Sequence, residues 1–391
     1  MSGKKMMLLA AGFLLILGLY QYSRPLPAID AISSLSVPET GKAITLPWPA
    51  YGQAAISAQG YGLLATSGEQ KPVPMASIAK VVTALAVLKQ KPLEKGQQGP
   101  NITISKDDVA IYNSYYSQDG SVVKVEAGEQ ISQYQALQAL LIPSANNMAE
   151  TLARWAFGSM ENYVTYANQM LQGLSLQNTQ VADASGFSPQ SVSSAKDLAR
   201  LGLAAIGNAV LASIVGQQTA ELPVAGTVNN LNWLLGEDGV IGIKTGNTDQ
   251  AGGCYLFASR RVVDGQSVTV VGAVMGAPDR NTAISDSRTI LRSIDTSFEN
   301  VVVIHKDQII GYYQTPWGAK ADAVADQNLS ILAWRGSQLQ TNAKLNKLKA
   351  PARAGTLVGS VSVTSGQKTS SIPVILKSNL PGPSWHWRIL R

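Results

Sequence analysis

The stretch MASIAKVVTAL, residues 75–85, places a serine and a lysine three positions apart at the start of an apolar run. Its apolar residues recur at three- and four-residue spacing, which is typical of the buried face of a helix. We therefore expect Ser77 in the first turn of a helix and Lys80 farther along on the same side. The pair indicates either a nucleophile with its base or a helix start with a charged flank.

Spacing alone does not decide between these readings, because Ser-x-x-Lys occurs five times in the chain. The other pairs are Ser2 with Lys5, Ser121 with Lys124, Ser193 with Lys196, and Ser365 with Lys368. The first lies in an apolar N-terminal segment, the second in a stretch that alternates like a strand, and the last in a hairpin turn. The pair at 193–196 precedes a helix and is the serious competitor, but without a further polar cluster it reads as a helix cap and a solvated lysine.

The residue counts exclude several chemistries. The 391 residues, 45% hydrophobic and 14% charged, can form a sizeable core, and the length suggests two domains plus a terminal segment. With two histidines, His305 and His386, and the single Cys254 in an apolar run, we expect no metal and no other cofactor. Both histidines lie in the C-terminal quarter, so the base of a serine nucleophile is expected to be another residue type.

The N-terminus carries two lysines followed by fifteen uncharged residues, 6–20. This length lies between a signal-peptide core and a membrane span, so residues 1–23 are read as a signal peptide or, preferably, an uncleaved membrane anchor. Residues 24–45, with their prolines and serines, are expected to form a linker. The rest of the chain would then lie at the extracytoplasmic face of the cell membrane. With a single cysteine it can form no intramolecular disulfide, so its fold is expected to be stabilised by its core.

The net charge of +6 has two readings: attraction to an anionic cell envelope, or an ordinary solvated surface. No dense run of Lys and Arg is interleaved with aromatic residues, so nucleic acid is not expected as a partner.

The distribution of apolar patterns predicts an α+β fold. Residues 46–299 have strand-like runs at both ends and helical patterns between them, which favours one antiparallel sheet covered by a helical cluster. Residues 300–391 show short alternating runs between turns and predict a small all-β sandwich. Trp385 and Trp387 near the C-terminus fit either a membrane interface or the sandwich core, and the core reading is preferred.

Two later motifs could supply polar partners to Ser77. Lys244 and Thr245, in GVIGIKTGNTDQAGG, stand at the end of a strand-like run and could bind a carboxylate, while neighbouring glycines would let a substrate backbone approach. Ser144 and Asn146, in LLIPSANNMAE, stand at a loop-to-helix junction. A lysine base must be neutral to accept a proton, and apolar surroundings with a second lysine nearby would lower its pKa.

Ser-x-x-Lys, Ser-x-Asn and Lys-Thr-Gly in this order are the motifs of β-lactamases and penicillin-binding proteins. With the longer stretches MASIAKVVTAL, LLIPSANNMAE, DASGFSP and NLNWLLGEDGVIGIKTGNTDQAGGCYLFASRR, the chain resembles the low-molecular-mass D-alanyl-D-alanine carboxypeptidases, which are serine peptidases. The resemblance covers about residues 50–295, and the β-rich tail is similar to that family's C-terminal domain. It implies a β-lactamase/transpeptidase-like domain at 46–299, followed by the sandwich at 300–391.

The resemblance also implies roles for individual residues. Ser77 would attack the carbonyl between the last two D-alanines of a peptidoglycan stem peptide, with Lys80 as the general base. Ser144, with Lys244 behind it, would relay the proton to the leaving amine, and Asn146 would hold the peptide amide. β-Lactams would act as covalent inhibitors at Ser77.

The substrate carboxylate would be received by Lys244 and Thr245, at the strand that carries Gly246. The amides of Ser77 and Asn247 would form the oxyanion hole; the family commonly has His at the position of Asn247, which matters little for a backbone donor. Arg280 is the nearest candidate for the arginine that helps bind the carboxylate, and a solvated loop arginine is the equal alternative.

Three alternatives remain at this point. A D,D-endopeptidase that cleaves peptidoglycan cross-links would use the same residues. A β-lactamase-like hydrolase would need a glutamate to activate water, and the window QGLSLQNTQVADASGF contains none. A non-catalytic envelope scaffold is the third, and the intact motifs argue against it.

Overall fold

The computed structural model describes residues 3–35 and 40–391. The chain divides into two compact units, Ile44–Phe298 and Met1–Ala43 together with Glu299–Arg391. Each unit has its own core of buried apolar side chains.

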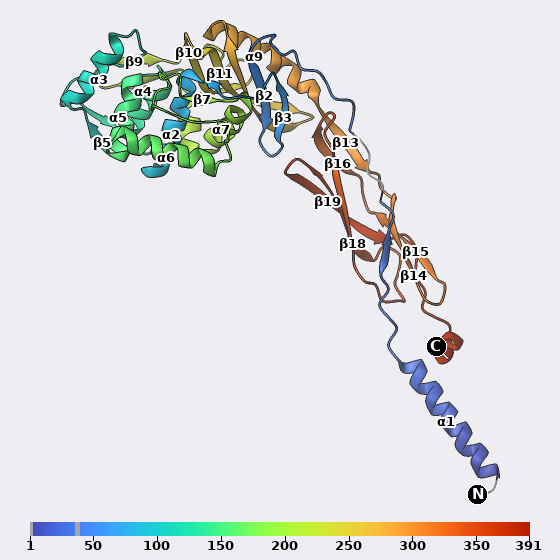
Figure 1. Ribbon diagram of the computed structural model, residues 1–391. Coiled ribbons are helices and arrows are strands. Elements are labelled where there is room, and N and C mark those ends of the chain that lie inside the picture. Colours follow the sequence, from blue (N-terminus) through green and yellow to red (C-terminus); the bar gives the residue numbers. More distant parts are fainter. Residues whose placement is uncertain (1–2, 36–39) are drawn as a thin grey trace. The chain divides into compact units, whose positions relative to one another are not determined.

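The Ile44–Phe298 unit is built on a five-stranded antiparallel sheet in the order β10-β11-β12-β2-β3 (Figure 1). The strands are β2 Gln53–Ala58, β3 Gly62–Ser67, β10 Val240–Thr248, β11 Gly252–Val263 and β12 Gln266–Ala277. Strands β2 and β3 pair antiparallel across a short turn. Since β10 is an edge strand, its outer backbone groups are open to a ligand.

Helices form the rest of this unit, as the three- and four-residue apolar spacing predicted. They are α2 Ala79–Gln90, α3 Lys106–Tyr116, α4 Gln133–Leu141, α5 Asn146–Phe157, α6 Met160–Gly173, α7 Ala195–Gly207, α8 Ala209–Val215 and α9 Arg280–Ile294. In β11, Cys254, Leu256 and Ala258 belong to the core shared with helices α2 to α8. Alternate β11 residues point to the opposite face, which α9 covers (Figure 1). The predicted α+β class is confirmed.

Three two-stranded sheets complete the unit: β4 Val73–Pro74 with β7 Val192–Ser193, β5 Asn101–Thr103 with β6 Gln130–Ser132, and β8 Thr219–Leu222 with β9 Gly226–Asn229. The strand-like reading around Ser121 is wrong, because residues 120–126 form no strand. The Asn147 side chain accepts from Val123 N at 3.0 Å and donates to Val123 O at 2.9 Å. A side-chain amide thus takes the place of a neighbouring strand while Val123 and Val125 stay buried.

The C-terminal part of the chain is rich in β-strands, as predicted, but it is not all-β, because residues 385–390 form a short helix. Its strands are β13 Phe298–Ile304, β14 Ile309–Gln314, β15 Lys320–Ala325, β16 Leu329–Trp334, β17 Gln340–Leu345, β18 Leu357–Ser365 and β19 Lys368–Leu376. A six-stranded sheet has the order β1-β14-β15-β19-β18-β17, in which β1 is Ala31–Ser33. The β13–β16 pair packs on this sheet through β16, which contacts β18 and β19.

The expected linker at 24–45 differs in part from the structure. Within it, β1 Ala31–Ser33 pairs antiparallel with the edge of β14, with Ala31 opposite Tyr313. An edge strand offers unpaired N–H and C=O groups, and this short segment satisfies them. Residues 36–39 of the expected linker lie outside the described residues.

The N-terminal helix α1 Gly3–Ser23 has no buried residue and is long and apolar enough to cross a membrane by length and composition. At the other end of the chain, α10 Trp385–Leu390 also buries no residue, so the preferred core reading of the tryptophans is wrong. Trp385 is 59% exposed, because α10 follows the last strand and packs beside α1 instead of inside the sheets. Arg388 Nη1 donates to Tyr22 O at 3.0 Å.

Candidate active site

Ser77 and Lys80 lie at a helix start, as the sequence predicted. Ser77 is in the 3₁₀ turn Ala76–Ile78, and α2 begins immediately after it with Ala79. Lys80 Nζ donates a hydrogen bond of 2.8 Å to Ser77 Oγ. Ser77 is half-buried and Lys80 is fully buried, so the hydroxyl faces solvent while the amine lies behind it.

The backbone at the two serine motifs is held in an unusual conformation. Ala76 has φ of 47° and Ser144 has φ of 68°, values in the left-handed region that residues with a Cβ seldom adopt. Such conformations persist only when the surrounding packing imposes them, and they cluster at functional sites. At Ala76 the strained residue directly precedes the serine hydroxyl.

The Lys80 amine is fully coordinated by the protein. Besides Ser77 Oγ, it donates to Asn146 Oδ1 at 2.7 Å and to Ser185 O at 2.8 Å. Burial lowers the pKa of Lys80 to about 7, and the Asp183 carboxylate opposes this change. A substantial fraction of Lys80 is therefore neutral near pH 7, which is the condition for a lysine base.

Lys244 is a second buried lysine next to this centre. It lies on β10 with 2% of its surface exposed, and its Nζ donates to Thr245 O at 3.0 Å. Burial, followed by the charges of Lys80 and Arg280, lowers the pKa of Lys244 well below its usual value. The two lysines and Arg280 thus form a positively charged region when protonated. The charges of Lys80 and Arg280 both disfavour the protonated form of Lys244.

Gly246 lets β10 pass directly beside the 3₁₀ turn of Ser77. A Cβ at this position would lie 3.1 Å from Ala76 Cβ and 3.2 Å from both Met75 O and Ser77 N. These contacts are tighter than ordinary van der Waals packing, so a glycine allows the approach of β10 to the nucleophile. The backbone amide of Ser77 therefore lies next to β10 at Gly246.

The remaining predicted residues of β10 lie on its other face. Thr245 is opposite Tyr255 in the β10–β11 register, so its side chain points away from that of Lys244. Asn247 lies on the same face as Thr245, and its Oδ1 accepts from Arg280 N at 3.1 Å. Arg280, the first residue of α9, therefore lies at this site, and its buried Nε has no hydrogen-bond partner in residues 3–35 and 40–391.

Ser144 is buried at the start of the loop that leads into α5, two residues before Asn146. Across the described residues its hydroxyl makes no hydrogen bond to another side chain, and Lys244 Nζ donates to Thr245 O instead of to Ser144. The expected contact between Ser144 and Lys244 is thus not formed in this structure.

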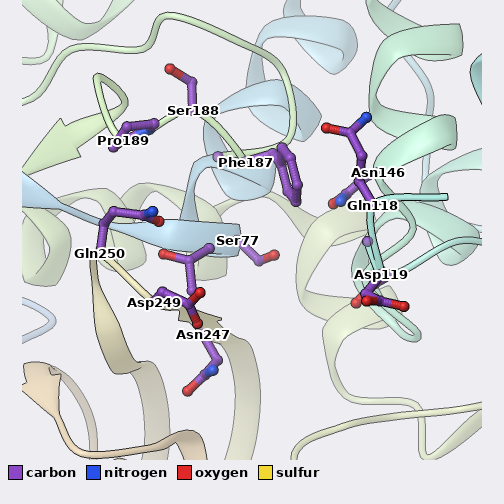
Figure 2. A pocket seen from close by; sticks show the side chains of 14 residues that line it. Ser77, Gln118, Asp119, Asn146, Phe187, Ser188, Pro189, Asn247, Asp249 and Gln250 are labelled. Carbon is purple, nitrogen blue, oxygen red and sulfur yellow. The ribbon is translucent and has the colours of Figure 1, made fainter. Parts of the chain in front are cut away.

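A cavity of about 730 Å³ opens in front of Ser77. It is lined by Ser77, Gln118, Asp119, Gly120, Ser121, Asn146, Gly186, Phe187, Ser188, Pro189, Asn247, Thr248, Asp249 and Gln250. Figure 2 shows Ser77 among the labelled side chains that line this cavity. Its size suits an extended peptide segment or a small drug-like molecule.

Sequence reasoning missed several of these residues. The alternating pattern of DGSVVKVEAGE, around Ser121, predicts a strand and not a cavity wall, and Ser185 takes part through its backbone carbonyl, which carries no residue-type signal. The stretch DASGFSP contributed to the resemblance but was given no role. Within residues 3–35 and 40–391, no cluster of three or more His, Cys, Asp or Glu side chains could hold a metal ion.

Comparison with known proteins gives a consistent result. The family model for D-alanyl-D-alanine carboxypeptidase matches residues 53–279. The D-alanyl-D-alanine carboxypeptidase DacC of Escherichia coli is 26% identical over 342 residues, which cover 84% of this chain and 83% of that protein. A D-alanyl-D-alanine endopeptidase of Pseudomonas aeruginosa is 28% identical over 263 residues, covering 63% of this chain and 78% of that protein.

The fold is also shared with solved structures. Penicillin binding protein 5 from Haemophilus influenzae, at 20% identity, covers 89% of this chain and 100% of its own, with a TM-score of 0.59. The family model spans the Ser77 turn, the Asn146 junction and β10, which together form the site. The chain therefore belongs to the D-alanyl-D-alanine carboxypeptidase family of serine peptidases.

Proposed function

We propose that Ser77 is the nucleophile with which this serine-type D-Ala-D-Ala carboxypeptidase removes the terminal D-alanine from peptidoglycan stem peptides. The observation that carries the proposal is the 2.8 Å hydrogen bond between Ser77 Oγ and Lys80 Nζ, with the pKa of Lys80 lowered to about 7. A serine hydroxyl needs a neighbouring base, and this amine is the titratable group in contact with it.

Acylation follows from this geometry. Neutral Lys80 takes the proton of Ser77 Oγ as the oxygen attacks the carbonyl carbon of the scissile bond. The backbone amides of Ser77 and Asn247 are proposed to hold the resulting oxyanion, which is supported by the close approach of Gly246, the residue before Asn247, to Ser77 N. The C–N bond then breaks, a proton passes to the leaving amine, and the remainder of the stem peptide stays as an ester on Ser77.

The proton for the leaving amine is proposed to come through Ser144 and Lys244. Ser144 lies two residues before Asn146, whose amide oxygen holds Lys80. Substrate binding would have to turn the Lys244 amine from Thr245 O toward Ser144. Water then attacks the ester carbonyl, which releases the shortened peptide as a carboxylate and restores the Ser77 hydroxyl.

The terminal carboxylate of the substrate is proposed to bind at the open edge of β10. Lys244 lies on one face of β10, while Thr245 and Asn247, whose Oδ1 accepts from Arg280 N, lie on the other. The buried Nε of Arg280, which has no hydrogen-bond partner in the part of the chain that the structure describes, is a donor that a carboxylate could satisfy. Asn146 would hold the peptide amide on the opposite wall of the cavity.

β-Lactams mimic the D-Ala-D-Ala terminus and are expected to acylate Ser77 by the same steps. A second candidate function is cleavage of peptidoglycan cross-links, because one similar protein is a D-alanyl-D-alanine endopeptidase. Both reactions use the same nucleophile, so the difference lies in the length of substrate that the cavity accepts beyond the scissile bond.

We also propose that α1 anchors the chain in the cell membrane, with the peptidase at the extracytoplasmic face. Between Lys5 and Gln21 the helix carries no charged residue and is mostly apolar, and none of its residues is buried. Arg391 Nη2 donates to Arg24 O at 2.5 Å and to Gln21 O at 3.3 Å, which holds the C-terminal helix beside the end of α1. The exposed Trp385 would then lie at the lipid interface, where indole rings are favoured.

Product analysis tests the activity. The purified chain is incubated with a stem pentapeptide and, separately, with a cross-linked dimer, and products are identified by mass spectrometry. Free D-alanine from the pentapeptide supports the carboxypeptidase, whereas separation of the dimer into its two stems without free D-alanine supports the endopeptidase. If Ser77→Ala releases product as fast as the parent chain from both substrates, the proposed nucleophile is wrong.

A further inference from the structure

The segment 183–191 forms a loop around one carboxylate. Asp183 Oδ2 accepts from the amides of Ser185, Phe187 and Ser188 at 3.3, 2.9 and 3.4 Å and from Ser185 Oγ at 2.7 Å. Asp183 Oδ1 accepts from Gly186 N at 3.1 Å and from Ser191 Oγ at 2.5 Å. Consecutive amides pointing at one anion form a nest, whose shape depends on that anion.

This loop is attached to the serine turn at both ends. Ser191 O accepts from Met75 N at 3.1 Å, next to the β4–β7 pair. On the other side, Gly186 has φ of 74°, and a Cβ there would lie 1.9 Å from Ala76 O. The loop therefore packs directly against the turn that carries Ser77.

The loop reaches Lys80 through its backbone. Ser185 O accepts from Lys80 Nζ at 2.8 Å, and Ala184 O accepts from Thr83 Oγ1 at 2.6 Å, one turn farther along α2. Ser185 itself donates two hydrogen bonds to Asp183. The position of the carbonyl that holds Lys80 is thus fixed by the Asp183 carboxylate.

Asp183 also contributes a negative charge near the Lys80 amine. It opposes the effect of burial on the pKa of Lys80. Burial raises the pKa of the Tyr163 and Tyr115 hydroxyls, so both stay neutral at the working pH. The other titratable groups on elements packed around this centre are Lys244 on β10, Arg280 on α9 and Glu150 on α5.

We propose that Asp183 is a positioning residue for the acylation of Ser77: its carboxylate fixes the loop that presents Ser185 O to Lys80, and its charge balances the buried cation. The inference rests on the proposed function, because Lys80 is the base in that reaction. Among the described residues, Asp183 makes no hydrogen bond to Ser77, and its proposed effect on that hydroxyl passes through Lys80. Phe187, in the same loop, lines the cavity, so the loop also shapes the substrate wall (Figure 2).

The experiment measures the second-order rate of acylation by a fluorescent penicillin between pH 5 and pH 9. Three variants of the full chain and one control are compared with the parent. D183N removes the charge and keeps one acceptor oxygen, and D183E keeps the charge but displaces it. S191A removes the hydrogen bond from Ser191 Oγ to Asp183 Oδ1. Asp264→Asn, in an exposed turn, is the matched control. Thermal melting is recorded for each variant.

For the parent we expect the acylation rate to rise with pH, and the midpoint of this rise reports the pKa of Lys80. D183N should move this midpoint to lower pH by roughly half a unit, because loss of a nearby negative charge disfavours the ammonium, and should lower the plateau about 10-fold. D183E and S191A should keep the midpoint within error and lower the plateau, and D264N should match the parent.

A purely structural role would lower the melting temperature and plateau of D183N but leave its midpoint unchanged, and that result overturns the proposal. If D183N does not fold, a D183E or S191A plateau equal to that of the parent overturns it instead. Absence of labelling in the parent chain is a different outcome, since it contradicts the Ser77 acylation itself.

Discussion

Two helices of this chain begin with the same pattern, Ser-x-x-Lys, and only one has the environment of a nucleophile. At α2, Lys80 is buried and donates to Ser77 Oγ, Asn146 Oδ1 and Ser185 O. At α7, Ser193 is buried against Thr179 Oγ1 at 2.8 Å, and Lys196 is half-buried on the flank of the helix. The residue spacing is identical in the two regions.

The difference shows what converts the spacing into chemistry. At α2, the serine is open to a cavity and the lysine is enclosed, whereas at α7 the serine is enclosed and the lysine reaches solvent. Even the cap differs from the prediction by one residue, since Ser194 and not Ser193 accepts from Asp197 N. Burial and partners from distant segments, more than the motif, separate a base from a solvated cation.

The largest difference between the two regions is expected when their lysines are replaced. Lys80→Met should lower the acylation rate by on the order of 10⁴-fold, because no other base contacts Ser77 Oγ within the described residues. Lys196→Met should leave the rate within 2-fold, as expected for a side chain on the helix flank. Stopped-flow labelling with a fluorescent penicillin measures both, and a comparable loss in the two variants would contradict the assignment.

The partner of Lys80 on α5 is tested next. Asn146→Ala removes an acceptor 2.7 Å from Lys80 Nζ and a polar group of the cavity. We expect a 10- to 100-fold loss of acylation, roughly the effect of losing one hydrogen bond to a charged group. Asn162→Ala, at an exposed helix start, is the matched control, and equal rates for the two variants would refute the role of Asn146.

A smaller effect is expected at the contact between β10 and the serine turn. Gly246→Ala adds a Cβ only 3.2 Å from Ser77 N, so the turn must shift by a few tenths of an ångström. Because oxyanion donors act at short range, acylation should fall about 10-fold with little change in melting temperature. An unchanged rate would show that the approach of β10 to Ser77 N has no part in the reaction.

The smallest effect concerns stability and pH. Burial lowers the pKa of Lys80 from 10.5 to about 7 in the folded chain, so the unfolded chain binds more protons between these two values. Stability should therefore rise with pH through this window, and Lys80→Met should reduce the rise between pH 7 and pH 9 by about 1 to 2 kcal/mol. Urea unfolding at the two pH values measures it; an identical rise in both chains would contradict the lowered pKa.

Much of the fold follows from local pattern. Helices α2, α5 and α7 were predicted because each buries one face, which sets a clear period in the sequence. The wrong strand around Ser121 shows the limit of this reasoning. Val123 and Val125 alternate as in a strand, but their backbone partner is the side chain of Asn147, which pattern alone does not reveal.

The candidate site was also predicted in part. Ser77, Lys80, Asn146 and Lys244 are brought together, and Arg280 lies beside Asn247. Asp183 was missed because its importance depends on backbone amides that fold around it and on a carbonyl that meets Lys80. The exposure of Trp385 was missed because a tryptophan-rich ending fits a core and an interface equally well.

The central claim is that Ser77, and no other serine, becomes covalently modified. The chain is incubated with a penicillin and digested, and the labelled peptide is identified by mass spectrometry in the parent, Ser77→Ala and Ser193→Ala. We predict one labelled peptide, containing residues 75–80, in the parent and in Ser193→Ala, and no labelled peptide in Ser77→Ala. A label on any other serine, or a label that persists in Ser77→Ala, would contradict the account.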